Sequence, residues 1–317
     1  MITTVTPNPS MDRTLHLTTF TRGAVNRVHR VMVEPSGKGI NVALALQTVG
    51  RDVTAVLPVG GPSGRALIAM LDAAGLAHRD VPITGAIRTN VSLIEADGTT
   101  SKVNEPGPEV SAQDIDDLIT AALTVSSVGE WVAWCGSLPA GFGESTLADA
   151  LAHTRSMGRR VALDSSGPAL RTAMGGSPDQ LPHLIKPNAD ELAELVDGVF
   201  TTLGDVADAA AELVRRGVET VLVSLGGDGA ILVNDQVALH GEAPVGRVVN
   251  TVGAGDAFLA GYLSAVEQPV DQRLTWALRF GATAVQHHGT LLSQPDPSQP
   301  VDVHTVDRTR RLPASTP

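Results

Sequence analysis

The sequence is poor in lysine. It has 23 basic side chains in 317 residues, but only Lys38, Lys102 and Lys186 are lysines and the others are arginines. Alanine, glycine and valine are abundant, so the scarcity of lysine follows composition and not fold. Because arginine is used wherever any cation would serve, the three lysines are candidate functional residues.

Cysteine and long apolar runs are scarce as well. The single cysteine, Cys135, cannot form an internal disulfide and ends an apolar run, which predicts a buried thiol in a cytoplasmic protein. No apolar stretch approaches the roughly 20 residues that cross a bilayer. The first residues lack the basic region and cleavage site of a signal peptide. We therefore expect no membrane segment and a cytoplasmic location.

Basic runs are also lacking. There are 34 acidic side chains against 23 basic ones, and the formal net charge is −11. Such a chain is not expected to bind nucleic acid or anionic membranes by general electrostatic attraction. With 43% hydrophobic and 18% charged residues, its composition is typical of a globular protein and not of a disordered one.

Short β-rich apolar runs alternate with helical patterns along most of the chain. The runs predict strands at residues 2–6, 53–59, 131–135, 160–163, 184–186 and 220–224. Helical patterns cover residues 39–49, 64–74, 112–123, 145–157 and 205–216. Several helices are followed by a glycine, where a chain turns left-handed before the next strand. The pattern predicts an α/β fold, a parallel sheet flanked by helices.

Two stretches interrupt this alternation and predict a lid. Residues 14–33 and 85–104 have short alternating runs, with a hairpin turn at Asp97-Gly98. Together they would form a small antiparallel β lid, although two ordinary surface hairpins would give the same pattern. We expect one α/β domain, with this lid, over residues 1–293. The Pro-, Ser- and Asp-rich residues 294–317 predict a loose C-terminal tail.

The most informative segment runs from residue 250 to 261. Gly253, Ala254 and Gly255 precede an apolar helical run, so backbone N–H groups and the helix dipole can converge on one anion. Such a nest suits a phosphoryl group or an oxyanion in transfer. Asp256 follows directly and could accept the proton of an attacking hydroxyl. The alternative is that Asp256 only caps the helix.

Two other loops follow predicted strands, at the sheet edge where ligands bind in open parallel sheets. The first is a glycine turn that is also compatible with a simple hairpin, and its candidate nucleotide contacts are Ser224, Gly226, Gly227 and Gly229. The second contains Lys186, Asn188 and Glu191. Asn188 and Glu191 have the spacing of a capping box, but Glu191 could also orient a water on Mg²⁺.

Other nucleotide and hydrolase motifs do not fit. Lys38 is followed by glycine, so there is no P-loop, and Val42 stands where a dinucleotide motif needs a small residue. Gly136-Ser137 does not form a hydrolase nucleophile elbow. The nine histidines have no metal-ligand spacing.

The N-terminal third has the residue types of a sugar site. Carboxylate, amide and bare backbone groups that bind hydroxyls are supplied by Asp12, Gly37, Lys38, Gly39 and Asn41. The predicted lid adds the cations Arg27, Arg88 and Lys102. Surface arginines are common singly, but as a set over a polyol site these cations indicate an anionic acceptor such as a sugar phosphate.

These motifs resemble the PfkB carbohydrate kinases of the ribokinase-like superfamily, from Thr6 to about Thr290. The resemblance is carried by residues 6–12, 23–27, 37–43, 136–139, 186–188 and 251–256. Within the family the motifs are most similar to the branch that phosphorylates fructose 1-phosphate. Close relatives act on tagatose 6-phosphate or fructose 6-phosphate.

The resemblance implies roles for the candidate residues. Asp256 would be the catalytic base, with Gly253, Ala254 and Gly255 stabilising the transferring phosphoryl group. ATP would contact Lys186, Asn188 and residues 224–229, with Glu191 near Mg²⁺. The sugar would contact Asp12, residues 37–39, Asn41 and Ser137, and its phosphate would contact Arg27, Arg88 and Lys102. The resemblance also implies a homodimer through the lid.

Two departures from the family pattern concern local structure. Pro35-Ser36 precedes Gly37 where relatives carry small residues, and polar His287 and His288 stand near the expected adenine pocket. The sequence thus predicts an ATP- and Mg²⁺-dependent kinase of a sugar phosphate, with fructose 1-phosphate favoured over tagatose 6-phosphate and fructose 6-phosphate. A kinase of a neutral sugar or nucleoside, or a sugar-binding regulator without activity, is the alternative.

Overall fold

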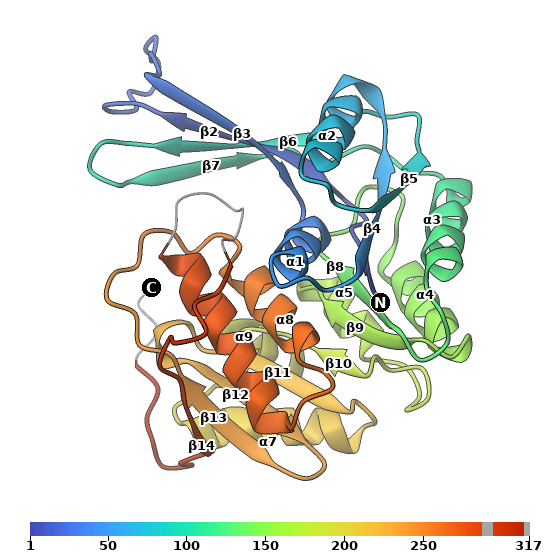
Figure 1. The fold of residues 1–317 in the computed structure, drawn as a ribbon, viewed down its shortest axis with the longest axis vertical. Coiled ribbons are helices and arrows are strands. Elements are labelled where there is room, and N and C mark those ends of the chain that lie inside the picture. Colours follow the sequence, from blue (N-terminus) through green and yellow to red (C-terminus); the bar gives the residue numbers. More distant parts are fainter. Residues whose placement is uncertain (287–293, 314–317) are drawn as a thin grey trace.

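The computed structural model describes residues 1–286 and 294–313, and it is built around one large twisted sheet (Figure 1). Ten strands of this described part form the sheet in the order β14-β13-β12-β11-β10-β9-β8-β1-β4-β5. Their bounds are β1 Ile2–Val5, β4 Val53–Val59, β5 His78–Pro82, β8 Trp131–Cys135, β9 Arg160–Asp164, β10 Leu184–Ile185, β11 Thr220–Ser224, β12 Ala230–Asn234, β13 Ala238–Glu242 and β14 Asp302–Thr305.

The strands from β11 to β5 are parallel, as predicted. Their apolar runs are buried on both sides because successive side chains point to opposite faces of a sheet. Ala55 and Leu57 pack in one hydrophobic core and Val56 packs in the other. Strands β12, β13 and β14 extend the sheet with antiparallel pairings.

Helices cover both faces of the sheet (Figure 1). One core contains side chains of α1 (Lys38–Gln47), α2 (Gly61–Ala73), α8 (Ala254–Ser264) and α9 (Val270–Val285). The other contains side chains of α3 (Ala112–Val125), α4 (Glu144–Ser156), α5 (Gly167–Ala173), α6 (Ala189–Val196) and α7 (Leu203–Arg215). The predicted left-handed glycines after the helices are confirmed, since φ is positive at Gly50, Gly75, Gly158 and Gly217. Among the described helices, none is long and apolar enough to span a membrane.

The small sheet predicted from the two interrupting stretches is present and projects from the main body (Figure 1). Within the described residues it has four strands in the order β3-β2-β6-β7, with bounds β2 Ser10–His16, β3 Arg30–Ser36, β6 Arg88–Ile94 and β7 Thr100–Asn104. The outer pairings lie within the two hairpins and are antiparallel, whereas the central β2–β6 pairing, which joins the hairpins, is parallel. We call this sheet the lid.

The expectation of a loose tail from residue 294 is wrong for the described residues that follow it. Strand β14 pairs with β13, so the C-terminal segment forms an edge of the large sheet. The Pro- and Ser-rich composition concealed an apolar pattern. Val301 and Val303 pack against one core and Val306 is buried in the other. Residues 314–317 of the predicted tail lie outside the described residues.

Candidate active site

A cavity of about 410 Å³ lies where the carboxyl ends of the parallel strands meet the lid. Three helices begin at its wall: α1 after Gly37, α6 after Asn188 and α8 after Gly253. The first N–H groups of a helix have no acceptor within the helix, and the dipole makes that end positive. The cavity therefore favours anionic ligands such as phosphates, in a protein with a net charge of −11.

Asp256 lies in the first turn of α8, and its side chain lines the cavity although the residue is 6% exposed. The N-cap residue of α8, Gly253, has a φ of 80°, which glycine adopts without strain. Asn41 of α1 donates a hydrogen bond from Nδ2 to Asp256 Oδ2 at 2.7 Å. Burial, reinforced by the negative charge of Asp164, raises the pKa of Asp256 to about 7. A carboxylate with this pKa can accept a proton near neutral pH.

A buried carboxylate joins the two lysines of the site. Asp164, at the end of β9, is fully buried and accepts a hydrogen bond from Lys38 Nζ at 2.9 Å. Lys186 Nζ, on a residue that is 5% exposed, lies 3.3 Å from the other oxygen of Asp164. Burial opposes ionisation of Asp164, but the two ammonium groups outweigh it and lower the pKa of this carboxyl. A Cβ on Gly255 would lie 3.4 Å from Lys186 Nζ, so this ammonium group reaches the start of α8.

The lid places one polar face toward this cavity. Its register aligns Ser36, Ser10 and Arg88 in one row across three strands, and Glu34, Asp12 and Asn90 in the next. Ser10, Ser36, Arg88 and Asn90 line the cavity. Asn90 donates hydrogen bonds from Nδ2 to Ser10 Oγ and to Asp12 Oδ1, both at 3.0 Å. Asp12 therefore orders the residues that face the cavity.

The site can thus combine a buried base, two lysines and several backbone N–H groups around one anion. Comparison with known proteins identifies a family of enzymes to which this site can be assigned. Residues 6–297 match the model of the pfkB family carbohydrate kinases. The chain belongs to this family. As a carbohydrate kinase, it is a phosphotransferase with a hydroxyl group as acceptor.

Similar members of the pfkB family support this assignment. The chain is 37% identical to a 1-phosphofructokinase of Rhodobacter capsulatus over 287 residues, covering 89% of this chain and 90% of that protein. It is 38% identical to a 1-phosphofructokinase of Haloferax volcanii over 282 residues, covering 89% and 88%. The crystal structure of phosphofructokinase-2 from Escherichia coli in complex with substrates and products is 29% identical. It has a TM-score of 0.87, with 92% of this chain and 95% of that one covered.

Most predicted site residues of this pfkB kinase lie together. The cavity lining includes the following of them: Gly37, Lys38, Asn41, Arg88, Lys186, Asn188, Glu191, Ser224, Gly253, Gly255 and Asp256. The predicted capping box is present, with Asn188 Oδ1 accepting the N–H of Glu191 at 2.7 Å and Glu191 Oε2 accepting that of Asn188 at 2.9 Å. The hairpin alternative is also correct, because the glycine turn joins β11 to antiparallel β12.

Other predicted residues lie outside the cavity lining. Arg27 and Lys102 are exposed, and Ser137 lines a neighbouring hollow where its Oγ accepts a hydrogen bond from Asn8 at 3.4 Å. Gly39 packs so closely on Thr6 that a Cβ would lie 2.4 Å from its Oγ1, so this glycine serves the fit of α1 against β1. His287 and His288 lie outside the described residues.

Sequence reasoning missed Asp164 and the polar lid residues Ser10, Ser36 and Asn90. Asp164 is the last residue of a buried apolar strand, and the carboxyl ends of strands are where ligands and catalytic groups gather in open sheets. That signal was available. No signal in the sequence indicated that Lys38, 126 residues earlier in the chain, donates to this carboxylate.

Proposed function

We propose that this enzyme transfers the γ-phosphoryl group of ATP to the 6-hydroxyl of fructose 1-phosphate, giving fructose 1,6-bisphosphate. The observation that carries the chemistry is Asp256, buried at the start of α8 with a pKa raised to about 7 and held by Asn41. The substrate is taken from the relatives named 1-phosphofructokinase, which are 33–38% identical over most of the chain.

Asp256 accepts the proton of the attacking hydroxyl as the new O–P bond forms. The oxygens of the transferring group then meet the N–H groups at the start of α8 and the ammonium group of Lys186, which lies over Gly255. Such preorganised donors stabilise charge that develops in the transition state. Asp164 keeps Lys38 and Lys186 in place, because it pairs with both.

Glu191 fits the role of a Mg²⁺ contact through water. Its carboxylate lines the cavity, and its capping hydrogen bond uses Oε2 and leaves Oε1 for a metal-bound water. No cluster of three or more metal-binding side chains occurs in the described part of the chain. This fits an ion that is bound through one or two carboxylates and the phosphates of the nucleotide. When bound, Mg²⁺ would neutralise phosphate charge.

The sugar phosphate binds against the polar face of the lid. Arg88 is half-buried there and its guanidinium donates to the carbonyl of Glu105 at 3.4 Å, so its cation is held at the cavity. Lys102 pairs with Ser92 in the lid, and this places it on the same face as Asn90 because side chains alternate along β6. We propose that Arg88, with Lys102 and Arg27 on lid closure, binds the phosphate group of the acceptor.

An ADP-release assay tests this function. The acceptors are fructose 1-phosphate, fructose 6-phosphate, tagatose 6-phosphate, fructose, ribose and adenosine, with Asp256→Asn as the inactive control. We expect the highest kcat/KM with fructose 1-phosphate. Fructose 6-phosphate is the second candidate, because a structure of phosphofructokinase-2 in complex with fructose-6-phosphate is 28% identical with a TM-score of 0.85. Preference for a neutral acceptor would refute the phosphate site, and absence of turnover would favour a regulator.

We further propose that the lid forms a homodimer. Its face opposite the polar one carries apolar side chains, and the exposed ones include Val31, Val33 and Val103. Exposed contiguous apolar surface on a sheet marks an interface. Val33→Asp should shift the molecular weight measured by light scattering from dimer to monomer. The matched control is Val199→Asp, at a position that is 87% exposed outside the lid. A monomeric parent protein would refute the proposal.

A further inference from the structure

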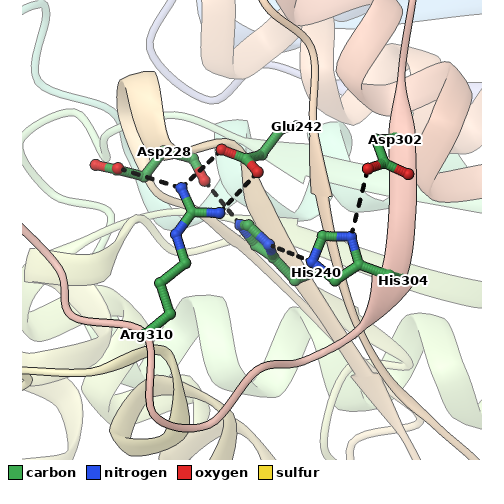
Figure 2. Close-up of polar contacts among 6 residues, drawn as sticks. All are labelled: Asp228, His240, Glu242, Asp302, His304 and Arg310. Atoms are coloured by element: carbon green, nitrogen blue, oxygen red, sulfur yellow. Dashed lines mark hydrogen bonds and ion pairs between the residues drawn. The ribbon is translucent and has the colours of Figure 1, made fainter.

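The C-terminal segment meets the glycine turn that follows β11. A cluster of polar side chains joins the two, and it is drawn in Figure 2. Its central residues are Asp228 in the turn, His240 and Glu242 on β13, and Arg310 after β14. We call these four residues the loop clamp.

Arg310 is held on two sides. Its two terminal nitrogens donate to the two carboxylate oxygens of Glu242, each at 2.7 Å, and one of them lies 3.9 Å from Asp228 Oδ1 (Figure 2). The Arg310 hydrogen bonds lower the pKa of Glu242, so this carboxylate stays ionised. The backbone is fixed as well, because Arg310 O accepts the N–H of Leu203 at 2.9 Å. Both the guanidinium and the backbone of Arg310 are therefore held by hydrogen bonds.

His240, on β13, contacts the backbone of the turn. This side chain is fully buried, and its Nε2 lies 2.8 Å from the carbonyl oxygen of Asp228. A carbonyl can only accept, so Nε2 carries the proton and Nδ1 is left as an acceptor. His304 Nε2 lies 3.3 Å from that Nδ1 and supplies its donor. The backbone of the turn is thus connected to β14 through two histidines.

Packing is sparse around the exposed part of the turn. Added Cβ atoms on Gly226 and Gly227 would meet nothing within 4 Å. On the other side, a Cβ on Gly229 would lie 2.0 Å from the carbonyl oxygen of Gly241, so the turn already abuts β13 there. Within the turn, Leu225 N donates to Gly229 O at 2.9 Å. Side-chain contacts from Arg310 and His240 therefore supply restraint that the glycines lack.

We propose that Arg310 is a positioning residue for the nucleotide, and that it acts by holding the turn of residues 225–229 through Asp228 and Glu242. This inference rests on the proposed function and on the contact of that turn with ATP that the family resemblance implies. An ordered turn presents its backbone N–H groups without the entropic cost of ordering them on binding. Loss of the clamp should therefore weaken ATP binding while the chemistry at Asp256 and the acceptor site stay unchanged.

The experiment compares Arg310→Gln, Arg310→Lys, the pair Arg310→Gln/Glu242→Gln and the control Arg308→Gln. Arg308 lies on the same segment but pairs with exposed Asp208 on α7. Hydrogen exchange of the unliganded protein reports on residues 225–229. Titration calorimetry gives the Kd of ATP, and steady-state assays give kcat and KM for each substrate.

We expect Arg310→Gln to speed exchange in the turn and to raise the Kd and KM of ATP about three- to fivefold, the effect of a partly exposed ion pair. The kcat and the acceptor KM should stay within about twofold, and Arg308→Gln should match the parent. The paired variant should be no worse than Arg310→Gln, because it also removes the Glu242 carboxylate that Arg310→Gln leaves without its partner. Arg310→Lys keeps the charge and should lie in between. If Arg310→Gln does not fold, the turn exchange and the Kd of ATP measured for Arg310→Lys test the proposal.

Three outcomes separate the ideas. Exchange in the turn that equals that of Arg308→Gln would overturn the clamp. Faster exchange with an unchanged Kd for ATP would overturn the role in nucleotide positioning. A parent protein that binds no ATP would instead refute the proposed function, while faster exchange in Arg310→Gln would still support the clamp as a structural contact.

Discussion

Replacing Asp256 by asparagine should lower the kcat by orders of magnitude and yet stabilise the protein above neutral pH. The carboxyl has a pKa of about 7 when folded and an ordinary value of 3.8, so the folded state holds its proton more tightly. Between these values, stability falls as pH rises, because ionisation is favoured in the unfolded chain. The full difference corresponds to about 4 kcal/mol.

Asparagine keeps the shape of the side chain without this cost. Its amide oxygen can accept the hydrogen bond from Asn41 Nδ2, and its amide N–H can donate to Asn41 Oδ1, which is buried without a hydrogen-bond partner. The free energy of unfolding of Asp256→Asn minus that of the parent should thus rise by ~1.4 kcal/mol per pH unit between about pH 4 and 7 and level off above.

Urea unfolding at pH 5, 6, 7 and 8 measures this difference. The control is Asp235→Asn, which changes an exposed carboxylate in the turn after β12 and should show no such trend. In the ADP-release assay the kcat of Asp256→Asn should fall about 10²- to 10⁴-fold, as expected for loss of a general base. A difference in stability that is the same at pH 5 and pH 8, or near-normal turnover, would refute the reasoning.

Three further changes, the last with a matched control, test other parts of the protein. Asp164→Asn leaves the two lysines without a shared counter-charge and should lower the free energy of unfolding by about 3–5 kcal/mol. Urea unfolding measures this loss, and an unchanged unfolding midpoint would contradict the pairing. Arg88→Ala should raise the KM for the sugar phosphate about tenfold, because a charge-assisted hydrogen bond is lost. The KM for fructose should not change. Equal effects on both KM values would refute the proposal that Arg88 binds the phosphate of the acceptor. Gly229→Ala forces a Cβ against Gly241 O at a φ of 84° and should destabilise by about 1–3 kcal/mol in thermal unfolding. Gly227→Ala, with open space around its Cβ, should stay within about 0.5 kcal/mol.

The architecture could be predicted because its signals are local. Strands at 53–59, 131–135 and 220–224 have the predicted bounds, since each is an apolar run with a helix or turn signal at its end. The position of Asp256 also follows from local glycines. The C-terminal strand could not be recognised in the same way, because its four residues gain stability from pairing with β13 and not from their own composition.

The electrostatics of the site depend on contacts between distant segments. Asp164 matters because Lys38 and Lys186 converge on it, and neither spacing forms a motif. The lid cations were likewise predicted as a set, but the register of the strands decides which of them faces the cavity. Arg88 lies at the base of the lid beside Ser10, whereas Arg27 is in the loop between β2 and β3.

The distance along the chain between Asp228 and Arg310 has a consequence for biosynthesis. The two residues are 82 positions apart, and ribosomes add roughly 5–20 residues per second. The glycine turn is therefore synthesised about 4–16 seconds before its guanidinium partner. During that interval β13 also lacks its neighbour β14, so the nascent chain exposes an unpaired sheet edge. The C-terminal segment, once made, pairs β14 with β13 and supplies the Arg310 side chain of the loop clamp.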